Sequence, residues 1–160
     1  MEFEKRLEKA IERGQRAGDA QARAAAQQAI SEEELKRLHT QYRLELSEHI
    51  ERCLKKLPDH FPGFRYETVV GDRGWGAAIS RDDVGRPDGG RRNFFSRLEM
   101  TVRPYSAYHV LELSAKGTIR NKEVYNRTHF QRLGEADPQS FTEMVDLWVL
   151  EFAELYAAKG

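Results

Sequence analysis

The sequence predicts an α+β fold, with a helical N-terminal segment, an antiparallel sheet of four to five strands, and one long C-terminal helix packed on the sheet. Three compositional zones indicate this order. Residues 1–57 contain no proline and are rich in strong helix formers. Residues 61–133 carry alternating aromatic and β-branched residues separated by turn residues, and the chain then returns to helical spacing from residue 137. A length of 160 residues suits one domain with a substantial core.

Residues 1–30 are predicted to form a helical extension that is weakly anchored. Its apolar stripe is one short run, formed by Phe3, Leu7, Ala10 and Ile11. After this run the same face holds only alanines, and Gly14 and Gly18 each cost up to about 1 kcal/mol of helix stability. We therefore expect the extension to lie on a partner helix, from the same chain or another, or else to fray.

Residues 31–160 are predicted to form a single α+β domain that begins with a helix over residues 31–57. Ser31 is the expected N-cap, and Glu34 completes a capping box with it. Apolar residues then recur at three- and four-residue steps, namely Leu35, Leu38, Tyr42, Leu46, Ile50, Cys53 or Leu54, and Leu57. Pro58 is expected to end this helix, because proline disrupts a helix interior.

Residues 61–133 are predicted to form the sheet. The candidate strands are Phe64–Val70, Trp75–Ser80, Phe94–Arg103, Tyr108–Arg120 and Glu123–Phe130. The short connections between them imply antiparallel hairpins, and the third strand alternates clearly between apolar and charged residues, so one face is expected to be buried. Between the second and third strands, the polar stretch RDDVGRPDGGRR, residues 81–92, is predicted to be a mobile surface loop.

The last helix is predicted over residues 137–158, with Asp137 as N-cap and Pro138 at the first helical position. Its expected core stripe is Phe141, Val145, Trp148, Phe152 and Leu155. Leu147 and Leu150 fall close to the arc that holds the acidic residues, so this helix is apolar nearly all round. Because such a helix is usually covered on more than one side, we expect it to contact the N-terminal helices or a second subunit as well as the sheet.

Charge balance and cysteine content exclude several classes of protein. The chain has 26 basic and 26 acidic residues, so its overall charge gives no argument for nucleic acid or an anionic membrane. Its single cysteine, Cys53, excludes an internal disulfide framework and fits a reducing setting. The charged N-terminus offers no signal-peptide core, and no run approaches the roughly 18 apolar residues of a membrane span. We therefore expect a cytoplasmic protein without a membrane partner.

The stretch GDRGWG, residues 71–76, has the glycine content of a phosphate-binding loop. Such a loop needs backbone amides that lead into a helix N-terminus, whereas this stretch follows RYETVV and leads into WGAAIS, which both resemble strands. We interpret it as a hairpin turn whose glycines accept positive φ, with an anion site as the alternative. Trp75 is expected to pack in the core or on the sheet rather than to form a ligand platform.

His49 and Cys53 lie four residues apart on the predicted helix, a spacing that places two potential metal ligands on one face. A zinc site needs two more ligands, and His60, the nearest candidate, follows a proline. We interpret the pair as a packed histidine and a buried thiol, and we predict no metal or cofactor. Nothing nearby marks Cys53 as a low-pKa nucleophile, and no catalytic motif stands out, so the sequence leans against an enzyme without excluding one.

The outer face of the sheet holds the predicted binding residues. They are Arg97 and Arg103 on the third strand, Tyr125, Arg127 and His129 on the last strand, and Arg91 and Arg92 beside the loop. Cations interleaved with aromatics on a sheet hold phosphates and stack bases in some single-strand binders, and they equally suit an acidic protein segment. The alternative is an ordinary solvated face with cross-strand ion pairs.

The sequence favours a non-enzymatic protein-binding module, adaptor-like or chaperone-like, that self-associates through its helices as a homodimer and binds an unknown protein partner. The predicted self-association residues are Phe3 and Leu7 on the first helix and Leu147 and Leu150 on the last. A second hypothesis is a nucleic-acid or phosphate-ligand binder that uses the outer sheet face. A third is a small-molecule-binding domain or enzyme with a pocket between the sheet and the C-terminal helix.

Overall fold

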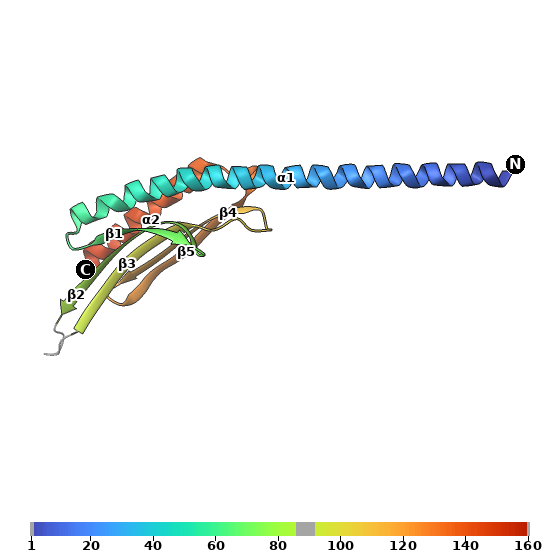
Figure 1. The fold of residues 1–160 in the computed structure, drawn as a ribbon. Coiled ribbons are helices and arrows are strands. Elements are labelled where there is room, and N and C mark those ends of the chain that lie inside the picture. Colours follow the sequence, from blue (N-terminus) through green and yellow to red (C-terminus); the bar gives the residue numbers. More distant parts are fainter. Residues whose placement is uncertain (1, 86–91, 160) are drawn as a thin grey trace. The chain divides into compact units, whose positions relative to one another are not determined.

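The structure is a computed structural model that describes residues 2–85 and 92–159, with the backbone alone for residues 27–30, 84, 85 and 92. It confirms the α+β class (Figure 1). The elements follow one another as α1 (Glu2–His60), β1 (Arg65–Gly71), β2 (Gly74–Gly85), β3 (Arg92–Val102), β4 (Val110–Ile119), β5 (Lys122–Arg132), the 3-10 turn η2 (Leu133–Glu135) and α2 (Pro138–Lys159).

The five strands form one sheet in the order β1-β2-β3-β4-β5, and every neighbouring pair is antiparallel. Each strand therefore pairs with the next along the chain, as the short connections predict. The stretch GDRGWG is the hairpin between β1 and β2, in which Gly71 pairs with Gly74. Gly74 has a φ of 130° and lies against the Val102 carbonyl, so a side chain there would meet both strain and backbone. The hairpin interpretation is confirmed.

The predicted loop over residues 81–92 is wrong at both ends. Strand β2 continues through Arg81–Gly85, where Asp82 pairs with Phe95 and Asp83 with Phe94, and β3 already begins at Arg92. The Arg81 side chain bonds both Asp83 Oδ1 and the Pro62 carbonyl, each at 2.8 Å, so polar residues extend the hairpin through their own contacts. The rest of the predicted loop, residues 86–91, lies outside the described residues.

The predicted helix start at Ser31 is also wrong, because α1 runs without a break from Glu2 to His60. Strong helix formers lie on both sides of Ser31, and inside a continuous helix the preceding turn satisfies the amides that a cap would otherwise bond. The helix also passes Pro58 by two residues. The Phe61 amide still donates to the Leu57 carbonyl at 2.8 Å, so a proline in this last turn does not stop the helix.

The chain divides into two compact units, Met1–Arg37 and Leu38–Gly160. The first unit is the N-terminal part of α1, in which every side chain from Glu2 to Ala26 is exposed. The second unit contains the rest of α1, the sheet and α2. Neither helix of the described chain contains a stretch whose length and hydropathy would let it cross a membrane.

The core of the second unit lies between one face of the sheet and the two helices. Buried residues come from α1 (Leu46, Ile50, Leu54, Leu57), from the sheet (Ala77, Ile79, Leu98, Met100, Val102, Leu111, Leu113) and from α2 (Phe141, Val145, Trp148, Val149, Phe152, Tyr156). The helix α2 packs against Gly117 of β4, where an added Cβ would lie 3.2 Å from the Phe152 ring. This packing places α2 beside the C-terminal turns of α1.

Candidate functional site

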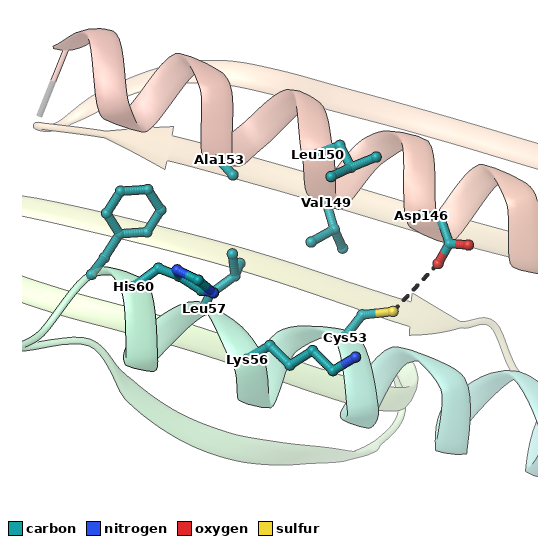
Figure 2. Close-up of a pocket in the computed structure, with 9 residues that line it drawn as sticks. Cys53, Lys56, Leu57, His60, Asp146, Val149, Leu150 and Ala153 are labelled. Carbon is teal, nitrogen blue, oxygen red and sulfur yellow. Dashed lines mark hydrogen bonds between the residues drawn. The ribbon is translucent and has the colours of Figure 1, made fainter.

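A cavity of about 510 Å³ lies between the C-terminal turns of α1 and the middle of α2 (Figure 2). It is lined by Cys53, Lys56, Leu57, His60, Phe61, Asp146, Val149, Leu150 and Ala153. The walls are mostly apolar, whereas Cys53 and Asp146 face each other at one end (Figure 2). Apolar walls with a few convergent polar groups are typical of binding sites.

Three side chains of different chemistry meet at that end. His49 Nε2 lies 2.7 Å from Asp146 Oδ1, and the Cys53 thiol donates to the same carboxylate oxygen at 3.4 Å. Cys53 Sγ is also 3.6 Å from His49 Nε2. His49 and Cys53 share one face of α1, and Asp146 reaches them from α2, so the cluster exists only because the two helices pack side by side.

The environment keeps the thiol protonated at neutral pH. Burial, followed by the hydrogen bond to Asp146 and its negative charge, raises the pKa of Cys53 to about 11. A thiolate nucleophile needs the opposite shift. The geometry is also unlike a catalytic relay, in which the two ring nitrogens contact the nucleophile and the acid separately, because here one nitrogen, Nε2, faces both Cys53 and Asp146.

Comparison with protein-family models, with curated proteins and with solved structures finds no match for this chain. Its function is therefore inferred from the geometry of its own residues.

Sequence reasoning missed Asp146 as a partner of Cys53, from which it is 93 residues distant. No local spacing connects two positions so far apart. The one signal is compositional, since Asp146 is the only charged residue in the run MVDLWVL, residues 144–150. A single carboxylate in an otherwise apolar run indicates a specific contact, but it does not say with which residue.

On the outer face of the sheet, the structure gives both Arg97 and Arg103 acidic partners. Arg97 bonds Glu67 at 2.6 Å and Glu99 at 3.0 Å, and Arg103 lies 3.4 Å from Glu112. The Arg97–Glu67 and Arg103–Glu112 pairs connect different strands, whereas the Arg97–Glu99 pair lies within β3. Such ion pairs are ordinary on a solvated sheet face. They neutralise the charge that an anionic ligand would need.

The predicted orientation of β5 is wrong. Tyr125 and Arg127 pair with Gly117 and Ala115, and His129 pairs with Leu113, so all three lie on the helix-covered face. Tyr125 is 4% exposed against Trp148, Arg127 reaches Glu151 at 3.1 Å, and the His129 ring lies 4.7 Å from that of Phe141. Phe130 takes the outer face instead and is 63% exposed.

The physical reason is the period of two along a strand, because an error of one residue moves every side chain to the other face. A register shift at Gly117 and Thr118 separates the two ends of the β4–β5 pair. Since β5 mixes polar and aromatic residues on both faces, alternation alone does not show which of its faces is buried. The predicted patch of Arg97, Arg103 and Arg127 beside Tyr125 is therefore not formed.

Two further binding candidates lie at the edge of what the structure describes. Arg91 is outside the described residues, and Arg92 begins β3 with only its backbone described.

The four predicted self-association residues are exposed, with exposed fractions of 72% for Phe3, 48% for Leu7, 46% for Leu147 and 67% for Leu150. Phe3 and Leu7 belong to the first unit and Leu147 and Leu150 to the second.

Proposed function

We propose that this protein is a non-enzymatic protein-binding module that self-associates through its helices. The observation that supports the proposal most directly is Leu150, which is 67% exposed while it lines the apolar cavity. Leu147, one turn earlier on α2, is 46% exposed. Full burial of a leucine side chain is worth roughly 1.5–3 kcal/mol, so a partner that covers both residues gains substantial free energy.

A second copy of this chain is the partner that this surface suits. In a two-fold dimer both subunits use the same patch, so the patch must complement itself. Leu150 stands beside a cavity of about 510 Å³ with apolar walls. Each copy thus offers both the side chain to be covered and a space that receives it, and we propose that Leu150 of each subunit enters the cavity of the other.

The first unit supports binding through a helix as well. Phe3, Leu7 and Ile11 recur every four residues, which places them on one side of α1, and their exposed fractions are 72%, 48% and 51%. Helical stability in proteins comes mainly from packing of such a face. We propose that this face binds a helix of a partner protein. A cytoplasmic location belongs to the same proposal, because a lone cysteine suits a reducing compartment.

Light scattering of the full chain over a range of concentrations tests the dimer. We expect a dimer for the unmodified chain and a monomer for Leu150→Asp, because a buried carboxylate without a partner is strongly unfavourable. Val70→Asp is the matched control, since Val70 is also exposed, at 68%, but lies on β1. It should remain dimeric. A monomeric unmodified chain at high concentration would refute the proposal. Equal loss of the dimer in both variants would show that the helices do not form the interface.

A further inference from the structure

The donor atoms of His49, Cys53 and Asp146 all lie within 4.8 Å of one another. A nitrogen, a sulfur and an oxygen ligand atom thus lie together at the end of the cavity, and all three residues are at least partly exposed to solvent. The His49 and Asp146 side chains are 22% and 53% exposed. We infer that these three residues bind a divalent transition-metal ion of the zinc class, at one end of the same cavity and without requiring self-association.

Two of the three separations between the donor atoms fit tetrahedral coordination. With Zn–S near 2.3 Å, Zn–N near 2.0–2.1 Å and Zn–O near 2.0–2.2 Å, a tetrahedral ion separates its ligands by about 3.6 Å for S and N, about 3.6 Å for S and O, and about 3.4 Å for N and O. The cluster has 3.6 Å, 3.4 Å and 2.7 Å for these pairs. The S–N and S–O separations agree with these values to within about 0.2 Å, whereas the N–O separation must lengthen by about 0.7 Å as an ion replaces the bridging proton.

The supporting shell holds the three ligands in place. Ile50 and Leu54, which follow His49 and Cys53 on α1, are fully buried, and Val145 and Val149 on either side of Asp146 are 0% and 7% exposed. The ligands thus project from two helices that are fixed by the core. Sites built on packed helices hold their geometry better than sites on loops, so little reorganisation opposes ion binding.

The ligand set selects the kind of ion. Thiolate and imidazole favour zinc, cobalt and related ions over magnesium and calcium, which prefer sites made of oxygen alone. In the metal-free form both the thiol and the His49 ring donate to Asp146 Oδ1. An ion takes the place of those protons: the thiol proton passes to solvent as the Cys53 sulfur becomes a ligand, and the His49 ring gives up its Nε2 proton and keeps one proton on Nδ1.

Three protein ligands leave one tetrahedral position open. Cys53 and Asp146 also line the cavity, whereas His49 is not among its lining residues. We therefore expect the remaining position to face the cavity. Sites of this kind accept water or a donor atom from a bound molecule as fourth ligand, in contrast to closed structural sites with four protein ligands. A bound ion would thus give the cavity a polar binding group in addition to its apolar walls.

Titration of the full chain with Co²⁺ tests the inference, because cobalt reports its ligands by absorption. We expect one equivalent to produce a thiolate-to-cobalt charge-transfer band in the near ultraviolet and the visible bands of a tetrahedral ion. Zinc should displace the cobalt, and an excess of Mg²⁺ should not. Absence of the charge-transfer band at saturating Co²⁺ in the folded, unmodified chain would overturn the assignment, whatever the variants do.

Ligand variants then locate the site. Cys53→Ser, His49→Gln and Asp146→Asn should each weaken zinc binding by roughly 100-fold or more, since even outer-shell changes cost about 10- to 100-fold. Asp59→Asn is the matched control, because Asp59 is exposed near the end of the same helix and is not among the residues that line the cavity. It should bind like the unmodified chain. His60 does line the cavity, so His60→Gln tests whether that residue is a ligand. A loss in His60→Gln equal to that in Cys53→Ser would place the ion elsewhere in the cavity and overturn the three-ligand assignment.

Discussion

His49 and Asp146 are 97 residues apart in the chain, yet His49 Nε2 lies 2.7 Å from Asp146 Oδ1. This contact joins the two helices at the end of the cavity. Because the Asp146 side chain is 53% exposed, solvent weakens the pair relative to a buried one. The contact therefore matters more for the position of α2 beside α1 than for overall stability.

A double-mutant cycle measures that coupling. His49→Gln and Asp146→Asn, made singly and together, should give an interaction energy of roughly 0.5–1.5 kcal/mol in urea unfolding, the usual range for a hydrogen bond. The measurement is made with a chelator present so that only the metal-free form contributes. Asp59→Asn combined with His49→Gln is the control pair and should be additive. Additivity in the test pair as well would mean that the helices are not joined there.

The thiol of Cys53 should alkylate slowly at neutral pH. Its pKa is raised to about 11 from an ordinary 9.0, with burial as the first cause and Asp146 as the second. Since the thiolate reacts, the rate should rise about tenfold per pH unit and level off only above that pKa. Asp146→Asn should increase the rate near pH 8, because it removes the charge that opposes ionisation. A rate that levels off near pH 9 in the unmodified chain would contradict the raised pKa.

His39 should make the second unit less stable in mild acid. The residue is 3% exposed, its Nε2 lies 3.1 Å from the Arg103 carbonyl, and burial is the main cause that lowers its pKa below 6.5. A pKa lowered by folding means that unfolding takes up a proton, so this contribution is present above about pH 6.5 and is lost as the pH falls further.

Replacing His39 by glutamine should flatten the dependence of the unfolding free energy on pH between about 7 and 5, where carboxylates contribute less than imidazole. The matched control is His60→Gln, because His60 is exposed. It should keep the original slope. Identical slopes in the two variants would show that the buried imidazole is not the group responsible.

Propensity and alternation predicted the order of the elements and most strand positions, because both are local properties of the chain. They failed where tertiary contacts decide the outcome. The residues Arg81–Gly85 extend β2 although they read as a loop, since pairing with β3 supplies the order that their composition does not. In β5 the face was assigned wrongly because aromatic residues occur on both sides of the strand.

Two of the three residues of the candidate site could be identified from the sequence. The spacing of His49 and Cys53 places them on one face of a helix, but their third partner, Asp146, comes from α2. Spacing rules act within one element, whereas a site between two helices depends on how those helices pack. For this reason the sequence-based expectation of a packed histidine and thiol omitted the carboxylate that brings the cluster together.

Gly117 tests the packing that positions α2, and with it the whole site. An added Cβ would lie 2.9 Å from the Tyr125 Cβ and 3.2 Å from the Phe152 ring, so Gly117→Ala should destabilise the second unit by about 1–3 kcal/mol in denaturant unfolding. Gly134→Ala is the matched control, because nothing lies within 4 Å of its added Cβ. It should be neutral or slightly stabilising.

The same pair of variants connects packing to the site. If α2 shifts away from β4 in Gly117→Ala, Asp146 moves relative to Cys53, and alkylation of the thiol near pH 8 should become faster than in Gly134→Ala. Equal unfolding free energies in the two glycine variants would mean that α2 does not approach β4 this closely. Unequal stabilities with equal alkylation rates would instead show that the strain is absorbed at Phe152 and leaves the contact between Asp146 and Cys53 intact.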